Sequence, residues 1–319
     1  MTFNATLASL NGRAWALSDE AAPAIRDLMA AEARGEKLAG RLAAVGGGGR
    51  ASSATQGAVQ VIPVMGIITQ SIDWIGTSTM WISAQLRRAL SDPGVSAIVL
   101  DVASPGGTVS GTPEVADEIF RARSAKPIVA FVNPLAASAA YWIASQASEI
   151  IMTRSGYAGS IGVFRLHMDL SGAMEQAGIR PTYISAGKFK TEINPYEPLG
   201  AEAKAYEQSQ IDSIYSDFIA AVARGRGVPA AKVRADFGQG RCMLAADAVR
   251  AGMADRIGTL ADAVGRAATR ARTAASSPTA RAFAGDPAKA ERHRRLAELA
   301  RDPAAEARAR RLRLLRASC

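Results

Sequence analysis

The feature that most constrains the fold is an alternation, between residues 58 and 264, of short apolar runs with longer helical stretches. The runs at residues 59–64, 97–102 and 127–132 have the length and composition of strands, and residues 80–90 and 113–123 have the spacing of helices. Strands that alternate with helices pack as the layers of an α/β domain. We therefore expect an α/β fold.

The alternation continues to the end of this region. We expect a helix after Ser138, strands near residues 149–152, 160–164 and 181–185, and helices near residues 169–177 and 201–224. No composition break interrupts the series, so residues 58–264 are predicted to form one domain.

Different compositions flank this domain on both sides. Residues 1–57 contain a short strand-like start, an amphipathic helix expected at residues 19–36, and the run Gly46-Gly47-Gly48-Gly49. A glycine run favours a flexible linker, and the phosphate-binding alternative lacks both a preceding strand and a following Lys-Ser/Thr pair. We thus divide the chain into a leader and linker (1–57), a core domain (58–264) and an Ala/Arg-rich tail (265–319).

The net charge of +9 belongs to the tail. Residues 265–319 hold 14 Lys/Arg and 5 Asp/Glu, whereas the other 264 residues hold 24 of each. The tail has few apolar residues and is expected to be disordered, or helical with a partner. Its charge suits acidic protein surfaces or the phosphates of nucleic acid, and the sequence leaves nucleic-acid binding open.

Several classes of protein are disfavoured. No apolar run is long enough to span a bilayer, and the first residues lack the pattern of a secretory signal, so we expect no membrane anchor and a cytoplasmic location. Cys242 and Cys319 have no metal-ligand spacing with either histidine. No metal or cofactor is expected.

Ser138 and Lys190 are the best candidates for catalysis. Small residues surround Ser138 in Ala136-Ala137-Ser138-Ala139-Ala140, and Lys190 follows Gly187-Lys188-Phe189. The only histidines, His167 and His293, lie in unpromising contexts, so a lysine base is the more economical partner for a serine nucleophile. Such a lysine must have its pKa lowered, and Lys188 could supply nearby charge and Phe189 some burial.

A turn after the predicted strand 97–102 could complete such a site. Ser104-Pro105-Gly106-Gly107-Thr108 contains two glycines that can expose backbone N–H groups to a developing oxyanion. Taken alone, Pro-Gly-Gly is an ordinary turn.

Five blocks in order resemble the signal peptide peptidase A (SppA-type) family of serine peptidases, over residues 58–264. The blocks are residues 101–107, 136–144, 158–163, 187–191 with Asn194-Pro195, and 224–227. The resemblance implies the ClpP/crotonase-like fold of repeated β-β-α units. It also implies a Ser-Lys dyad with Ser138 as nucleophile and Lys190 as general base, oxyanion N–H groups from Gly107 and Ala139, and Ser160 orienting the lysine. Family members usually have glycines where this chain has Ala139 and Ala140, and these methyl groups would narrow the pocket.

The resemblance also bears on partners. Family members usually form ring-like homo-oligomers in which neighbours complete the active sites. Because we expect no membrane anchor and the sequence carries the Trp15-Ala16-Leu17 leader, it is more similar to the phage and prophage head maturation branch than to the cellular peptidases. This branch implies peptide or protein substrates, capsid, portal or scaffold partners for the tail, and a host-cytoplasmic or procapsid location.

Other readings remain open at this level. The same fold supports crotonase-like acyl-CoA enzymes with acidic catalysts, for which Glu149 or Glu192 could be nominated, and a capsid scaffold without catalysis. Lys188 could exchange roles with Lys190. Two partial motifs, Ser185-Ala186-Gly187-Lys188 and Ala158-Gly159-Ser160-Ile161-Gly162, lack the companions that their enzyme classes require.

Overall fold

The computed structural model describes residues 14–17, 54–71 and 76–276. The chain divides into two compact units, residues 1–269 and 270–319, and the second is described only as far as Ser276. The fold that follows is that of the first unit.

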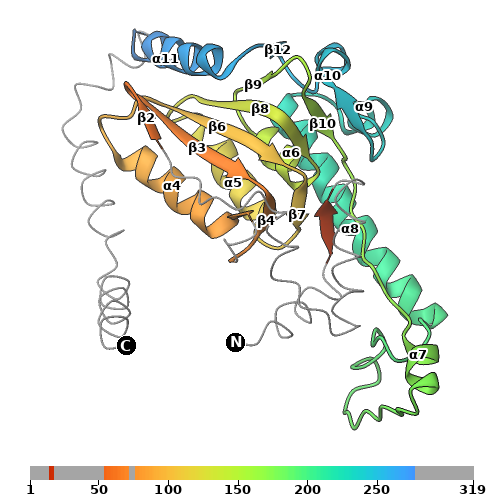
Figure 1. Cartoon of the computed structure of the whole chain (residues 1–319). Coiled ribbons are helices and arrows are strands. Elements are labelled where there is room, and N and C mark those ends of the chain that lie inside the picture. The colour runs from red at the N-terminus through yellow and green to blue at the C-terminus, as the bar shows by residue number, and fades with distance from the viewer. Residues whose placement is uncertain (1–13, 18–53, 72–75, 277–319) are drawn as a thin grey trace, which may run out of the picture. The chain divides into compact units, whose positions relative to one another are not determined.

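A largely parallel sheet lies at the centre of this unit (Figure 1). Strands β3 (Val59–Met65), β6 (Ala97–Ser104) and β8 (Ile128–Ala137) pair in parallel in that order. Along its first half β8 also pairs with β9 (Glu149–Met152), and its last three residues pair with β10 (Tyr157–Gly159). β8 thus changes its neighbour along its length, and Ser138 is the residue that follows it. Strands β2 (Ala54–Gln56), β11 (Cys242–Leu244) and β12 (Arg256–Ile257) pair at the sheet's margins.

A smaller sheet collects the short strands that follow the central ones. β4 (Ile67–Thr69) follows β3, β7 (Gly106–Thr108) follows β6, and these two short strands pair in parallel. β5 (Gly76–Ser78) and β1 (Trp15–Leu17) pair on the outer sides of β4 and β7. Helices α4 (Thr79–Ser91) and α5 (Thr112–Ala122) come next in the chain. The expected β-β-α unit therefore occurs twice.

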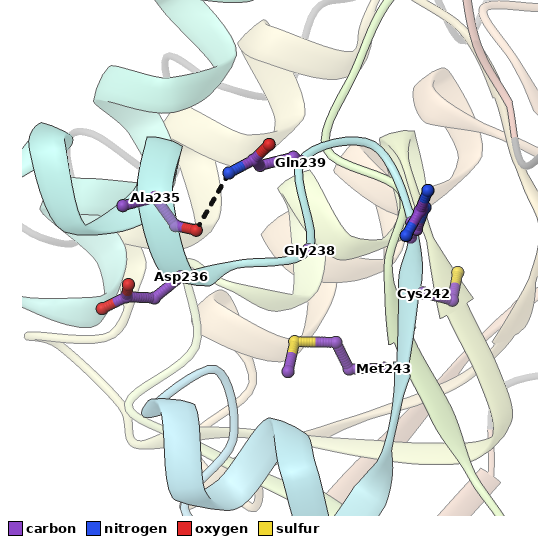
Figure 2. A pocket seen from close by; sticks show the side chains of 7 residues that line it. Ala235, Asp236, Gly238, Gln239, Cys242 and Met243 are labelled. Carbon is purple, nitrogen blue, oxygen red and sulfur yellow. Dashed lines mark hydrogen bonds between the residues drawn. The ribbon is translucent and has the colours of Figure 1, made fainter.

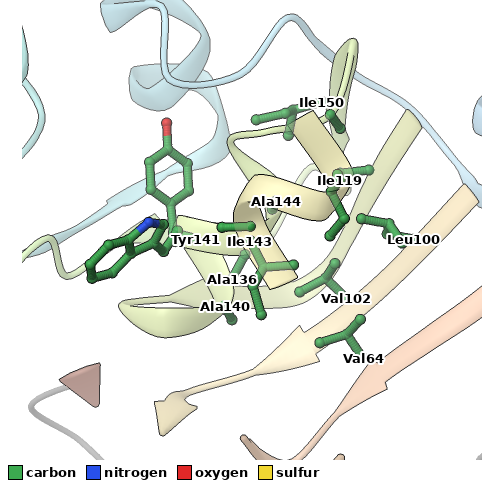
Figure 3. Packing of buried hydrophobic residues seen from close by; sticks show 14 of the residues in the cluster. Val64, Leu100, Val102, Ile119, Ala136, Ala140, Tyr141, Ile143, Ala144 and Ile150 are labelled. Atoms are coloured by element: carbon green, nitrogen blue, oxygen red, sulfur yellow. The ribbon is translucent and has the colours of Figure 1, made fainter. Parts of the chain in front are cut away.

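The core lies between the central sheet and its helices. The inner strands carry nearly continuous buried apolar residues, as expected when helices cover a parallel sheet. In Figure 3, Val64, Leu100 and Val102 from the strands pack with Ile119 of α5 and Ile143 of α6 (Ala139–Ala144). The helix that begins after Ser138 is thus part of the core.

The C-terminal half consists mainly of helices. The long helix α8 (Ala201–Arg226) is followed by α9 (Ala230–Asp236), α10 (Ala245–Ala251) and α11 (Leu260–Ser276). Residues 165–200, with the short α7 (Ser171–Gln176), form an arm beside the N-terminal end of α8, far from the central sheet (Figure 1). Lys190, which was expected to follow a strand at residues 181–185, lies in this arm.

Most of the expected elements are confirmed, and the α/β class with them. Two strands are wrong. Residues 160–164 are not a strand, because Ser160 has a φ of 52° directly after β10, and Phe164 makes only an isolated bridge. Residues 181–185 have no neighbouring strand among the described residues, and Ile184 is fully exposed.

The expected helix at residues 19–36, the glycine linker and Cys319 lie outside the described residues. The segment boundaries at 57/58 and 264/265 stay predictions. Trp15–Leu17, from the predicted leader, belongs to the small sheet, and α11 runs through residue 265.

Candidate active site

Ser138 sits at a sharp turn between β8 and α6. It has φ 54° and ψ −119°, a backbone conformation that a residue with a side chain seldom adopts, and it is fully buried. Its N–H donates to the Gly159 carbonyl at 2.7 Å, and its hydroxyl donates to the Gly162 carbonyl at 3.3 Å. A strained serine between a strand and a helix is typical of catalytic nucleophiles.

The residues around Ser138 explain why this turn is stable. Ala136, Ala137, Ala139 and Ala140 are fully buried, and larger side chains in such a packed position are generally destabilising. Further along α6, the Tyr141 hydroxyl donates to the Met253 carbonyl, and the Trp142 ring stacks on Phe218 with centroids 4.3 Å apart. Burial of the Tyr141 hydroxyl raises its pKa well above the usual range, so it stays a neutral donor. These contacts fix α6 to the core.

Ala139 and Ala140 stand where family members usually have glycines. Both belong to the hydrophobic core cluster. Their methyl groups therefore add to the packing of α6, and their effect on the width of the pocket stays a prediction. The Ala139 N–H lies in the first turn of α6, where a helix supplies no carbonyl for it.

Gly106 and Gly107 are close to Ser138. A Cβ at Gly106, where φ is 102°, would lie 3.0 Å from the Cβ of Ser138. A Cβ at Gly107 would lie 1.8 Å from the Ile68 carbonyl oxygen of β4, so only glycine fits there. Gly106 thus allows β7 to pass directly beside the buried serine, and Gly107 allows it to pack against β4.

Ser160 lies at the end of the strand next to that of Ser138. Gly159 pairs in register with Ala137, so Ser160 and Ser138 are the next residues of two adjacent parallel strands. Ser160 is 4% exposed, and its N–H donates to the Arg241 carbonyl at 2.9 Å. The structure therefore gathers Ser138, Ser160, Gly107 and Ala139 at one place.

Lys190 is separate from this group. It is exposed and lies in a turn of the arm, where its N–H donates to the Gly187 carbonyl at 3.1 Å. No hydrogen bond joins its side chain to Ser138 in the part of the chain that the structure describes. Phe189, expected to bury the lysine, is 51% exposed, and the Lys188 ammonium pairs with Glu202 at 3.1 Å. The predicted dyad is therefore not assembled within one described chain.

The alternative catalysts occupy structural positions. Glu149 is 1% exposed and pairs with Arg256 at 2.7 Å and with Arg266. Glu192 lies in a turn of the arm, and its N–H donates to the Phe189 carbonyl at 3.5 Å. His167 lies outside any strand, and its buried Nε2 has no hydrogen-bond partner among the described residues. Neither glutamate contacts the Ser138 group by any described hydrogen bond.

A hollow of about 480 Å³ lies between α9 and β11 (Figure 2). Its lining consists of Ala235, Asp236, Gly238, Gln239, Arg241, Cys242 and Met243. Ser138 and Lys190 are not among these residues, so the hollow is not the proposed catalytic pocket. Cys242, which also lines the hollow, has no role in the predicted chemistry.

Sequence reasoning missed two contacts beside Ser138. β1 pairs with β7, and Trp15 bridges to Phe164. The only sequence signal was the strand-like start of the leader. This signal does not reveal that the strand pairs with β7 and Phe164, which lie far away in the sequence.

Among the described residues no helix is both long and apolar enough to cross a membrane. They contain no group of three or more His, Cys, Asp or Glu side chains arranged to hold a metal ion.

Comparison with known proteins gives consistent matches. The model of peptidase family S49 matches residues 121–274. The head-tail preconnector protein GP5 of Enterobacteria phage P21 is 32% identical over 66% of this chain and 43% of its own length. The capsid assembly protease C of Escherichia phage lambda is 33% identical over 65% of this chain and 48% of its own length. Protease 4 of Salmonella typhi is 33% identical over 60% of this chain and 31% of its own length. The chain spans less than half the length of each of these relatives.

Proposed function

We propose that this chain, which matches the model of peptidase family S49 over residues 121–274, is a serine peptidase with Ser138 as its nucleophile. The observation that carries the proposal is the strained, buried Ser138 beside the side-chain-free backbone of Gly106 and Gly107. This arrangement lets an extended peptide approach the hydroxyl closely.

The proposed reaction proceeds through an acyl-enzyme. Ser138 Oγ attacks the substrate carbonyl, and the N–H groups of Gly107 and Ala139 stabilise the oxyanion. Lys190, in its neutral form, takes the hydroxyl proton and passes it to the leaving amine, and water then hydrolyses the ester. Ser160 orients the lysine and is a positioning residue.

We propose that Lys190 reaches Ser138 from a neighbouring copy of the chain. Lys190 is exposed on the arm while Ser138 is buried in the core, so the two have no described contact within one protomer. The arm also exposes large apolar side chains, namely Ile179, Tyr183, Ile184 and Phe189. Such a surface favours burial against a partner, and a homo-oligomer would supply one.

The proposed substrate is a capsid or scaffold protein. The support is the similarity to a phage capsid assembly protease and a phage head-tail preconnector protein. The chain would then act in the host cytoplasm or in the procapsid, as a peptidase domain of residues 58–264 with a leader and a basic tail. Protease 4 of Salmonella typhi supports the second candidate, a cellular peptidase of broader substrate range.

A fluorophosphonate probe and a peptide-hydrolysis assay test the chemistry. Ser138→Ala and Lys190→Ala should each lower hydrolysis by about 10³-fold or more, and Ser138→Ala should abolish labelling. Ser185→Ala and Lys204→Ala, both at exposed positions, serve as matched controls. Full proteolysis by Ser138→Ala would refute the assignment and leave the acyl-CoA and scaffold alternatives.

A mixing experiment tests the shared site. The Ser138→Ala and Lys190→Ala proteins, each inactive, should regain part of the activity when they are dissociated and reassembled together. This recovery follows because a Lys190→Ala protomer keeps its serine and a Ser138→Ala neighbour keeps its lysine. Absence of recovery in mixed oligomers of native size would show that each site uses its own lysine.

A further inference from the structure

β1 is held by backbone hydrogen bonds on both of its edges. On one side its residues pair antiparallel with β7, with Trp15 opposite Thr108, Ala16 opposite Gly107 and Leu17 opposite Gly106. On the other side the Trp15 N–H donates to the Phe164 carbonyl at 2.9 Å, and the Phe164 N–H donates to the Trp15 carbonyl at 3.0 Å. An extended segment added to a strand edge is a general mode of peptide binding.

The two segments that hold β1 both come from the site of Ser138. β7 contains Gly106 and Gly107, and Phe164 follows Ser160 and Gly162, the latter being the acceptor for the Ser138 hydroxyl. The space between β7 and Phe164 is therefore a groove beside the nucleophile, and β1 fills it.

The carbonyl of Ala16 is the group of β1 that lies against the catalytic residues. The position of a Cβ at Gly106 would be 2.2 Å from the Ala16 carbonyl oxygen and 3.0 Å from the Cβ of Ser138. Both atoms thus border the same small space, which stays open because residue 106 has no side chain.

The ladder also brings this carbonyl to the proposed oxyanion donor. The Val109 N–H donates to the Ala14 carbonyl at 3.2 Å. Hydrogen-bonded pairs alternate along an antiparallel ladder, so the next such pair is Ala16 with Gly107, whose N–H faces the Ala16 carbonyl. A substrate whose scissile carbonyl bonded to Gly107 would have this same register.

From this geometry we propose that residues 14–17 are bound as a substrate and that the Ala16–Leu17 peptide bond is the chain's own cleavage site. Ser138 Oγ attacks the Ala16 carbonyl carbon, the C–N bond to Leu17 breaks, and the hydroxyl proton passes through Lys190 to the Leu17 nitrogen. Water then cleaves the Ser138 ester, which leaves a carboxylate on Ala16 and restores the hydroxyl. The inference rests on the proposed function and deepens it.

The side chains of β1 define the substrate class. Ala16 is fully buried and Trp15 is 3% exposed. The groove therefore takes an extended peptide with a small residue at the cleaved bond and a large aromatic or apolar residue before it. Until the bond is cut, the leader keeps other peptides out of the groove.

Cleavage is tested by intact mass and N-terminal sequencing of the full chain. Wild-type protein should lose the residues before Leu17, whereas Ser138→Ala should keep them. Ala16→Arg should also stay uncut, and a matched change of an exposed alanine, Ala125→Arg, should be processed normally. A wild-type protein that hydrolyses an added peptide yet keeps the Ala16–Leu17 bond would overturn the proposal.

A second measurement does not depend on catalysis. In the Ser138→Ala background, hydrogen exchange of the Gly107 and Val109 amides should be slow, and Ala16→Arg should speed it at least tenfold while Ala125→Arg does not. Equal exchange in all three proteins would overturn the binding of β1 in the groove. Slow exchange in a protein without any peptidase activity would refute the proposed function and the cleavage step, while supporting the pairing of β1 with β7.

Discussion

Ser138 and Ser160 share an uncommon backbone conformation, with φ of 54° and 52° at the ends of two adjacent parallel strands. A positive φ at a residue with a side chain costs about 1–3 kcal/mol and persists only where the surroundings compensate it. Here the two N–H groups donate to Gly159 and Arg241, which stabilises both turns. If these two positions served packing alone, alanine or glycine would suit them equally well. The hydroxyl groups of Ser138 and Ser160 therefore favour a role in hydrogen bonding or catalysis.

Ser160→Ala is predicted to damage catalysis less than either dyad substitution. A residue that orients the base affects its direction and pKa without transferring the proton itself, so kcat/KM should fall by about tenfold to a hundredfold. The acid limb of the pH-rate profile should shift as well. Ser155→Ala, at an exposed position nearby, is the control. An unchanged rate together with an unchanged profile would remove Ser160 from the mechanism.

Asp101 offers a prediction about stability. Burial in the middle of β6 raises the pKa of its carboxyl above 3.8, because the charged form loses solvation. Ionisation is thus less favourable in the folded than in the unfolded state, and stability falls as pH rises through the raised pKa. Asp101→Asn should be more stable than wild type in urea unfolding at pH 7, and the difference should shrink toward about pH 4. A difference independent of pH would point to packing instead.

At the scale of elements, the sequence pattern correctly predicted the buried strands of the central sheet. The apolar run at residues 149–152 became β9 as expected, because both of its faces are buried. The run at residues 181–185 also has the length of a strand but lies in the exposed arm, and a local sequence pattern cannot tell whether a neighbouring strand exists. The blocks around Ser138, Ser160 and Gly107 lie together as their motifs suggested. The position of Lys190 and the pairing of β1 depend on tertiary structure, which local pattern does not encode.

The attachment of the last described elements to the sheet depends on a buried ion-pair group. Glu149 at the start of β9 is 1% exposed and pairs with Arg256 of β12 and Arg266 of α11. Replacing both arginines by alanine would leave a buried carboxylate without these cations, at a cost of about 3 kcal/mol. Thermal unfolding should show a clearly lower Tm for the double variant than for the exposed control Arg154→Ala. A Tm equal to that of the control would mean that Glu149 is satisfied by other groups.

At the scale of the whole molecule, the charge distribution separates a nearly neutral body from a basic end. Residues 277–319 hold 11 Lys/Arg and 5 Asp/Glu, and Phe283 is their only aromatic residue. Contacts to nucleic acid would therefore be made through phosphates and would weaken strongly with salt, since no aromatic platform for bases is present in this segment. The same charge suits acidic surfaces of capsid or scaffold proteins, which we propose as the partners of the tail.

The design of a tail deletion follows from α11. Truncation after Gly265 would cut this helix and remove Arg266, a partner of the buried Glu149, so a loss of activity could reflect damage to the fold. Truncation after Ser276 keeps the helix and removes only the basic segment. We predict that this shorter protein hydrolyses a small peptide at the wild-type rate and binds acidic capsid components more weakly in pull-down at about 0.1 M salt. Changing the eleven basic residues to glutamine in the full-length chain should have the same effect if charge is the cause. Lost peptide hydrolysis in the folded, truncated protein would show instead that residues 277–319 complete the active site or the oligomer.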